Sequence, residues 1–441
     1  MQTSRRTFLK TSAATAALLG FPAILRAQSP NSLLQVAVVG AAGQGLSDLS
    51  QIGSHSRVKF AGFCDVDTSR FDAADKKFPD VPHFQDFRKM FAKLGDGFDA
   101  VLVAIPDHMH AFVSLDAMRR GKHVYCEKPL THTVWEARQM RLQADRSKVV
   151  TQMGNQIHSS SEYRTAVRLI REGAIGKITA VHSWQGNAGN GYTRLTAAPA
   201  PGPAPATLDW DKWLGTAPQR EFAPKVYHPF NWRDWQDFGS GTMGDFGCHI
   251  LDPVFTALEL TAPVSIRAEN EGMNDQTWPA AETVNYIFPG TTWTAGKTLP
   301  LTWHDGGRKP ERALTQMPEG KELPGSGSLF IGEGGTLVLP HVGKPQLYPE
   351  EKFATFEVKK EPGSSHYHAW VDAALAGTKT TDGFDYAGPL TEAVQLGNVA
   401  TRSPGVTLEW NAADFRIPNH PEAERLLTKP YREGWKIEPV A

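Results

Sequence analysis

The sequence predicts an α/β protein in two parts: a doubly wound parallel sheet, then an α+β domain with a mainly antiparallel sheet. Three observations lead to this prediction. From residue 34 to about 154, short β-branched apolar runs alternate with helix-like segments, as in parallel βαβ units. After Pro263, strand-like runs follow one another with Gly and Pro turns between them. The chain has 441 residues, which is enough for two or three domains.

The composition excludes several classes of protein. Lys and Arg number 46 against 47 for Asp and Glu, so the basic excess typical of nucleic-acid binding is missing. No run of 18 apolar residues could span a membrane in the mature chain. Three cysteines cannot form a disulfide framework, which agrees with folding in a reducing cytoplasm. We therefore expect neither a nucleic acid nor a membrane as a partner.

Residues 1–30 have the pattern of an export signal. Ser4 to Lys10 reads S-R-R-T-F-L-K, and an uncharged, alanine-rich apolar stretch follows from Ala13 to Leu25. Paired arginines before a short apolar region indicate twin-arginine export. An amphipathic helix is the alternative, but this stretch has no polar face. Because that route carries folded proteins, we expect a periplasmic protein that can leave the cytoplasm with a cofactor inside.

The first expected strand, 34–39, ends in a glycine-rich turn before a helix from Leu46. Such a turn lets the backbone approach a pyrophosphate, whose charge is favoured by the helix N-terminus. The middle glycine of the G-x-G-x-x-G pattern is replaced by Ala42, a mild departure. An ordinary βα turn is the alternative interpretation. The turn residues that we expect to bind a dinucleotide are Gly40, Ala42, Gly43 and Gly45.

Asp65 closes the second expected strand, 58–64, and lies 25 residues after Gly40. This is near the spacing of the carboxylate that binds the adenine-ribose diol. Because a carboxylate there would repel a 2′-phosphate, we predict NAD, with NADP less favoured. Two alternatives stay open: Asp65 as a helix cap, and nearby Arg70 as a 2′-phosphate ligand.

The alternation continues with strands at 98–105, 123–126 and 149–153 and helices at 111–119 and 133–144. Asp107, Lys128 and Asn155 each follow a strand end, where ligands bind in such sheets. Lys128 could hydrogen-bond a substrate hydroxyl beside a nicotinamide. A surface lysine after a turn is the alternative.

The second half begins with an expected helix at 160–172 and a strand at 177–184. Residues 187–207 are rich in Ala, Gly and Pro without periodicity, so we expect a surface loop or an arm. In the aromatic stretch that follows, Trp232 and Arg233 suit stacking on a sugar and holding its hydroxyls, with core packing as the alternative.

A helix expected from Met243 would place Asp245 and His249 four residues apart on one face. A carboxylate beside an imidazole can fix its tautomer and raise its basicity, which makes His249 a candidate acid/base; a structural pair is the alternative. The remaining expected elements are strands at 264–269, 283–288, 299–303 and 336–339 and helices at 367–376 and 386–401.

Together these motifs resemble the Gfo/Idh/MocA family (glucose–fructose oxidoreductase, inositol dehydrogenase, rhizopine catabolism) in its exported bacterial type. The resemblance covers nearly the whole mature chain. The segments that carry it are 40–45, 64–67 (C-D-V-D), 106–110 (P-D-H-M-H), 127–130 (E-K-P-L), 244–252 (G-D-F-G-C-H-I-L-D), 384–398 and 431–435 (Y-R-E-G-W).

The resemblance implies a Rossmann domain over 34–154 and a substrate-binding domain over 155–441 whose large open sheet often mediates homo-oligomers. It implies an NAD(P)-dependent oxidoreductase acting on a CH-OH group of a sugar, a sugar derivative or a cyclitol. Lys128 matches the active-site lysine, and Asp245 and His249 match the acid/base pair. The cofactor contacts expected beyond the turn and Asp65 are Pro106, His110, Glu127 and Lys128; the substrate contacts expected are Asn155, Trp232, Arg233, Asp245 and His249.

Free NAD is scarce outside the cytoplasm, so we expect the cofactor to stay bound. One alternative function is redox-neutral glycoside cleavage or epimerisation through a transient keto sugar; the family's NAD-dependent glycosidases usually lack the E-K-P lysine, so Lys128 counts against cleavage. Another is a binding module, if Lys128 and His249 are structural. A metal enzyme on His108, His110 and His249 is disfavoured because His-x-His lacks the spacing of a closed zinc site, and we expect no metal ligand.

Overall fold

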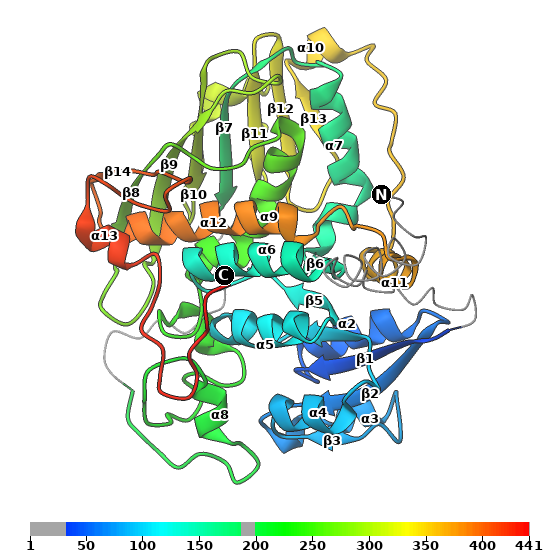
Figure 1. Ribbon diagram of the computed structural model, residues 1–441. Helices are drawn as coiled ribbons and strands as arrows, with labels where there is room; N and C mark the ends of the chain where they lie inside the picture. The colour runs from blue at the N-terminus through cyan, green and yellow to red at the C-terminus, as the bar shows by residue number, and fades with distance from the viewer. Residues whose placement is uncertain (1–31, 187–198, 441) are drawn as a thin grey trace, which may run out of the picture. The chain divides into compact units, whose positions relative to one another are not determined.

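The computed structural model describes residues 32–186 and 199–440, and the predicted export signal therefore lies outside the described residues. The fold described below belongs to one compact unit that begins at Leu34 (Figure 1). None of the helices in these ranges has both the length and the apolar character that a membrane span requires. Cys64, Cys126 and Cys248 are buried free thiols.

The first half of the unit is a six-stranded parallel sheet, as predicted, with strand order β3-β2-β1-β4-β5-β6. The chain order reverses beside β1, and ligands of such sheets bind at this switch point. The strands are β1 (Leu34–Val39), β2 (Val58–Cys64), β3 (His83–Phe84), β4 (Ala100–Val103), β5 (His123–Glu127) and β6 (Thr151–Gly154).

Helices connect these strands. Helix α5 begins at Asp107, four residues before the predicted start. The prediction began late because the polar residues His108 and His110 are buried in the first turns of the helix, together with Met109, and hide its apolar periodicity. The helices of this half are α2 (Gln44–Gly53), η1 (Thr68–Arg70), α3 (Asp72–Asp75), α4 (Phe87–Leu94), α5 (Asp107–Arg119) and α6 (Val134–Ser147).

The second half contains an eight-stranded sheet with strand order β13-β12-β11-β7-β10-β9-β8-β14. Only β7 and β10 pair in parallel, so the predicted mainly antiparallel sheet is confirmed. The strands are β7 (Ile178–Gln185), β8 (Ser265–Glu271), β9 (Ala281–Pro289), β10 (Thr298–His304), β11 (Ser326–Gly332), β12 (Gly335–Pro340), β13 (Gln346–Tyr348) and β14 (Thr407–Glu409).

Strand β11 was not predicted, although it lies inside the sheet between β7 and β12. Its sequence S-G-S-L-F-I-G looks like a turn at both ends. Gly327 is needed there because its φ is +157° and a Cβ would lie 2.3 Å from the carbonyl oxygen of Leu339. The glycine that hid the strand therefore permits the close pairing with β12.

The helices of the second half join the sheet to the first half. Helix α9 forms as predicted despite Pro253 and three glycines, and it packs against β7 and β11. Helix α12 packs along α6, where Arg138 and Glu392 form a two-bond ion pair at 2.7 and 2.8 Å. The helices are η2 (Gln156–Ser159), α7 (Ser161–Arg171), α8 (Trp210–Leu214), η3 (Asn231–Asp234), α9 (Gly241–Leu258), η4 (Arg312–Thr315), α10 (Glu350–Phe353), α11 (His366–Ala376), α12 (Phe384–Thr401) and α13 (Pro421–Arg425).

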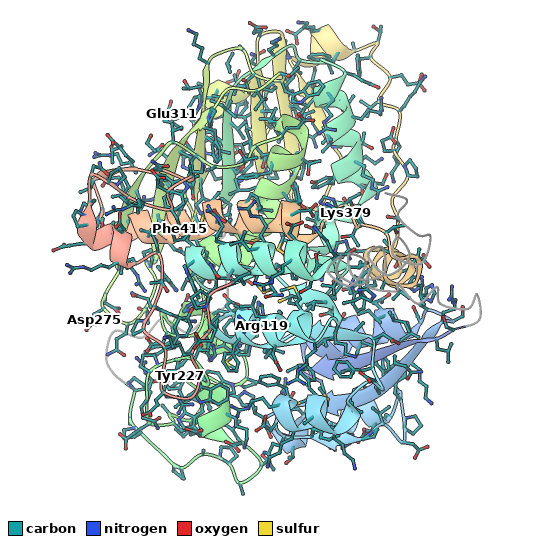
Figure 2. All side chains as sticks on the ribbon, viewed as in Figure 1. Arg119, Tyr227, Asp275, Glu311, Lys379 and Phe415 are labelled. Atoms are coloured by element: carbon teal, nitrogen blue, oxygen red, sulfur yellow. The ribbon has the colours of Figure 1, made fainter. Side chains whose placement is uncertain are left out.

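Side chains fill the spaces between these layers, and charged side chains such as Lys379 and Asp275 lie at the surface (Figure 2). Trp370 and Val371 of α11 belong to the same core as β1 and α2, so the second half completes the core of the first. The division at residue 154 stays a prediction. Of the predicted loop 187–207, residues 187–198 are outside the described ranges, and 199–207 contain no helix or strand.

We predict that Leu102→Ala in β4 lowers the free energy of unfolding by about 2–5 kcal/mol, because the side chain is fully buried and its loss leaves a cavity. The matched change Leu142→Ala on α6, where the side chain is 39% exposed, should stay within about 0.5 kcal/mol. Urea unfolding of both variants measures the difference. Equal losses would contradict the packing described here.

Candidate active site

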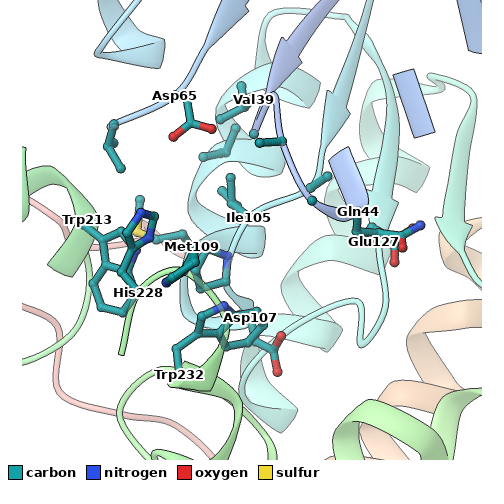
Figure 3. A pocket seen from close by; sticks show the side chains of 18 of the residues that line it. Val39, Gln44, Asp65, Ile105, Asp107, Met109, Glu127, Trp213, His228 and Trp232 are labelled. Carbon is teal, nitrogen blue, oxygen red and sulfur yellow. The ribbon is translucent and has the colours of Figure 1, made fainter. Parts of the chain in front are cut away.

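A cavity of about 380 Å³ opens at the carboxyl ends of the parallel strands, within the size range of small-molecule sites. Its wall combines the glycine turn, the ends of β2, β4 and β5, the loop around Trp232, and α9 (Figure 3). The predicted site residues that line it are Gly40, Ala42, Gly43, Asp65, Pro106, Glu127, Lys128, Trp232, Arg233 and Asp245.

The glycine turn has the geometry that a dinucleotide requires. Gly40 has φ +96°, and a Cβ there would lie 2.0 Å from the carbonyl oxygen of Ala104. Gly43, with φ +58°, caps α2, whose first N–H groups face the turn. Gly45 does not line the cavity. It lets α2 pack on Gly40, since a Cβ at Gly45 would lie 2.1 Å from the carbonyl oxygen of Gly40. The turn therefore brings bare backbone to the cavity wall.

Asp65 is held in place by the backbone. One carboxylate oxygen accepts from the N–H of Ala41 and the other from the N–H of Asp67, both at 3.1 Å. Burial raises the pKa of Asp65, and these two bonds oppose the rise. The helix cap is Asp67 and not Asp65: the carboxylate of Asp67 accepts a hydrogen bond from the N–H of Ser69 at the start of η1. Asp65 is thus free to face a ligand in the cavity, which Arg70 also lines.

Lys128 is not a surface lysine. Its ammonium at the end of β5 donates to Asp245 of α9, at 2.5 Å to Oδ1 and 3.0 Å to the carbonyl oxygen. Burial alone would lower the pKa of Lys128, but Asp245 and Glu127 outweigh burial and raise it. Lys128 is therefore a charged hydrogen-bond donor at neutral pH.

His249 is positioned by a different residue from the one predicted. Its Nδ1 is hydrogen-bonded to Oδ1 of Asn155, while Asp245 pairs with Lys128. The amide nitrogen of Asn155 donates to the carbonyl oxygen of Cys248 and to Asp252, which fixes the amide's orientation. His249 must then carry its proton on Nδ1, which leaves Nε2 as an acceptor.

The surroundings of His249 keep it neutral. Burial lowers the pKa of His249 well below its usual range, and Lys128 and His341 lower it further. Asn155 is fully buried and is not part of the cavity wall; in this structure it supports His249, and its expected contact with the substrate stays a prediction. His249 itself does not line the 380 Å³ cavity; it borders a separate, smaller cavity together with His341.

His110 has a structural role in this structure, and its expected contact with the cofactor stays a prediction. Its two ring nitrogens face the carbonyl oxygens of Pro129 at 2.8 Å and Ile105 at 2.7 Å, and it is outside the cavity wall. It therefore ties together the loops that follow β4 and β5. His108 lies between the carbonyl oxygens of Trp213 and Phe238 in the same way.

Trp232 and Arg233 both line the cavity, and their expected contact with a sugar stays a prediction. Trp232 is 7% exposed and packs in an aromatic cluster, yet it lines the cavity. The Arg233 guanidinium lies 4.4 Å from the ring centres of both Phe230 and Trp232, and its Nε is 3.6 Å from Asp245. A cation held over aromatic rings beside a carboxylate can position a polyhydroxylated ring.

Asp107 also lines the cavity. Its position after a strand predicts a place at the crevice, but the sequence indicates no role for it. It is the first residue of α5, 4% exposed, and close enough to feel the charges of Arg233, Asp245 and Lys128. Burial raises the pKa of Asp107 to about 7, against a hydrogen bond with Ser240 and the charge of Arg233. The signal in the sequence was an acid directly after a buried strand.

Comparison with known proteins agrees with an NAD-binding oxidoreductase. Residues 34–155 match an oxidoreductase family's NAD-binding Rossmann fold, and residues 173–321 match that family's C-terminal alpha/beta domain. The chain belongs to the Gfo/Idh/MocA oxidoreductase family. Residues 2–22 match a twin-arginine translocation signal, so the predicted signal is confirmed.

Curated relatives match over part of their length. Inositol 2-dehydrogenase of Corynebacterium glutamicum (strain R) is 28% identical over 165 residues, 36% of this chain and 48% of the relative. Levoglucosan dehydrogenase of Pseudarthrobacter phenanthrenivorans is 27% identical over 34% of this chain and 30% of its own. A glycosyl hydrolase family 109 protein of Shewanella (strain ANA-3) is 26% identical over 33% of each. The chain thus spans less than half of these relatives.

Solved structures share the fold over most of the chain. The WlbA dehydrogenase from Bordetella pertussis, in complex with NADH and UDP-GlcNAcA, superposes with a TM-score of 0.59 and 14% identity, covering 86% of this chain and 99% of its own. Aldose-aldose oxidoreductase from Caulobacter crescentus gives 0.55 and 15%, covering 86% and 100%. At these identities the comparison establishes the fold.

The raised pKa of Asp107 predicts a pH-dependent loss of stability. The unfolded chain releases this proton near pH 4 and the folded protein near pH 7, so the unfolded state binds fewer protons between them and stability falls as pH rises. Asp107→Asn should remove this dependence of the free energy of unfolding on pH. Relative to the wild type, the variant should gain up to about 4 kcal/mol between pH 4 and 7, from about three pKa units at 1.36 kcal/mol each.

Urea unfolding across this pH range measures the effect. Asp116→Asn, on the same helix but 32% exposed, is the control and should not show this gain. A constant difference between Asp107→Asn and the wild type at every pH would show that Asp107 is ionised in the folded protein.

Proposed function

We propose that this protein is an NAD-dependent oxidoreductase that acts on a hydroxyl group of a sugar, a sugar derivative or a cyclitol, with NAD tightly held. The observation that carries the proposal is the charged Lys128–Asp245 pair in the cavity wall, with neutral His249 one helical turn beyond Asp245. A donor and a base close together are what removal of a hydroxyl proton requires.

The residues of the cavity fit NAD. Gly40 and Gly43 have no side chain between the backbone and the cavity, which suits a pyrophosphate at the N-terminus of α2. Asp65 has carboxylate lone pairs left for the adenine-ribose diol. Pro106 and Glu127, at the ends of β4 and β5, border the part of the cavity next to Lys128. When bound, NAD supplies the hydride acceptor.

The protein's own residues then handle the proton and the substrate. Nε2 of His249 accepts the hydroxyl proton, since Asn155 holds the other nitrogen protonated. Lys128 donates a hydrogen bond to the same substrate oxygen and stabilises the charge that develops there. Asp245 keeps Lys128 charged and oriented, and Trp232 and Arg233 hold the sugar ring.

A second candidate is redox-neutral cleavage of a glycoside through a transient keto sugar. Asp107 favours it, because a carboxyl with a pKa of about 7 in the cavity can move a proton at a second substrate position. The similarity to the family 109 hydrolase agrees with this candidate. Net release of a glycoside's leaving group without accumulation of NADH would establish it over simple oxidation.

We also propose that the protein works in the periplasm as a homo-oligomer. The match to the twin-arginine signal supports export. The sheet face away from α9 carries half-exposed and exposed side chains, including Asn285, Thr302 and His304, which suits contact with a second copy. Light scattering on the purified protein would reveal the oligomer.

Coenzyme choice tests the role of Asp65. NAD should bind more tightly than NADP, and Asp65→Asn should weaken NAD binding about 10- to 150-fold, since a hydrogen bond to a charged group contributes about 1.5–3 kcal/mol. Arg70→Gln is the control on the same cavity edge and should leave NAD affinity nearly unchanged. Fluorescence titration with both reduced coenzymes measures the affinities. Equal or tighter binding of NADP by the wild type would overturn the assignment.

His249→Ala should lower the turnover rate about 10²- to 10⁴-fold with little change in NAD affinity, because it removes the general base. Asn155→Ala should lower it less and shift the acid limb of the pH–rate profile, since the imidazole loses its fixed tautomer. His304→Ala is the control, because His304 lies on β10 of the second sheet and does not line the cavity. Its turnover rate should equal that of the wild type. Turnover is followed at the reduced-nicotinamide absorbance over a panel of sugars. An unchanged rate and profile in His249→Ala would remove His249 from the mechanism.

A further inference from the structure

A second group of ionisable side chains lies buried behind the active site. His158 of η2, Asp252 of α9 and Asp382 before α12 are 6%, 0% and 1% exposed. One nitrogen or oxygen atom from each lies within 4.8 Å of those from the other two. Neither the cofactor nor the proposed reaction uses them, and none lines the 380 Å³ cavity.

The carboxylate of Asp382 makes no hydrogen bond to any residue in the ranges that the structure describes, and both of its oxygens are buried. The nearest ionisable groups are another carboxylate, Asp252, and the imidazole of His158. A buried carboxylate that faces a second one is costly unless it is protonated or a positive charge lies between them, and burial raises the pKa of Asp382 well above its usual range. A cation bound between the two carboxylates would also remove this cost.

Asp252 and His158 are rigidly held. Asp252 accepts hydrogen bonds from Tyr163 at 2.9 Å and from Asn155 at 2.8 Å, which orient its carboxylate as the surroundings of metal ligands do. Nε2 of His158 lies 3.1 Å from the hydroxyl of Thr381 and can donate to it. Nδ1 of His158 is within hydrogen-bond distance of Asp252, and an ion bound there would displace the proton that the two share.

The spacing fits shared coordination. Nδ1 of His158 lies 3.0 and 3.2 Å from the two oxygens of Asp252. Neighbouring ligands of a tetrahedral ion with bonds of about 2.0–2.1 Å are roughly 3.3 Å apart. Small movements of these side chains would therefore accommodate an ion.

We propose that His158, Asp252 and Asp382 form a binding site for a divalent first-row transition-metal ion, with Zn²⁺ as the best fit. An imidazole with two carboxylates suits Zn²⁺, whereas Mg²⁺ and Ca²⁺ prefer oxygen ligands alone. A second cavity, of about 790 Å³, is lined by His158, Thr381 and Tyr386 and gives the ion a path to the site. This site differs from the His108, His110 and His249 set considered from the sequence.

The ion would have a structural effect on the active site. Asp252 accepts from the amide of Asn155, and the same amide is bonded to His249. An ion that fixes Asp252 therefore also fixes the residue that orients His249. The proposal does not depend on the substrate or on the direction of the proposed reaction.

Metal content tests the proposal directly. The full-length mature protein is purified without a metal-affinity step, stripped with EDTA and titrated with Zn²⁺ by calorimetry, and the bound metal is counted by mass spectrometry after desalting. We expect the protein to bind one equivalent of Zn²⁺ tightly, and a large excess of Mg²⁺ should not displace it. Asp382→Asn should weaken it at least about 100-fold, since losing even a residue behind the ligands costs 10- to 100-fold.

The control is His304→Gln. His304 and His182 stack on the sheet with ring nitrogens 3.2 Å apart and are the obvious place for adventitious zinc, so this variant should keep the tight equivalent. The proposal is overturned if the wild type takes up no tight equivalent, or if folded Asp382→Asn retains it. If Asp382→Asn does not fold by circular dichroism, His158→Gln replaces it with the same two outcomes. None of these measurements depends on catalytic activity.

Discussion

The ion pair between Lys128 and Asp245 is the interaction on which the rest of the site depends. It joins the end of β5 in the parallel sheet to α9, which packs on the second sheet, so each half of the unit supplies one charge. Both side chains are only about 15% exposed, and removing either would leave the other charge buried and unpaired. The pair therefore ties the end of the parallel sheet to α9 while it keeps Lys128 charged.

Behind this pair, α9 carries a row of polar side chains that support one another. Asp245, His249 and Asp252 follow at intervals of about one turn, and each is bonded to a residue from another element: Lys128, Asn155 and His158. Pro253 and the glycines would weaken an isolated helix. Packing against β7, β11, α7 and α12 overcomes this cost, and a Cβ at Gly244 would lie 2.1 Å from Cβ of Ser240, which caps the helix.

Much of the fold could be predicted because the parallel strands are continuous apolar runs and the turn at Gly40 has a strong local signature. Lys128, Asp65 and Asp245 were found for the same reason: each stands at a strand end or at a fixed helical spacing. The pairing of His249 with Asn155 could not be predicted, because these residues are 94 positions apart and meet only when α9 packs against η2, which follows Asn155. The structural role of His110 could not be predicted since a sequence does not show which carbonyl groups its ring will face, and β11 was missed because its glycines look like turns.

We expect the cavity at the end of the parallel sheet to hold NAD tightly enough for the cofactor to be exported with the folded protein. The most direct measurement is the nucleotide content of the protein purified from its exported form without added coenzyme, then denatured, with the supernatant assayed enzymatically for NAD and NADH. The account predicts close to one equivalent per chain. An empty protein that needs millimolar added NAD and releases NADH in every cycle would contradict it.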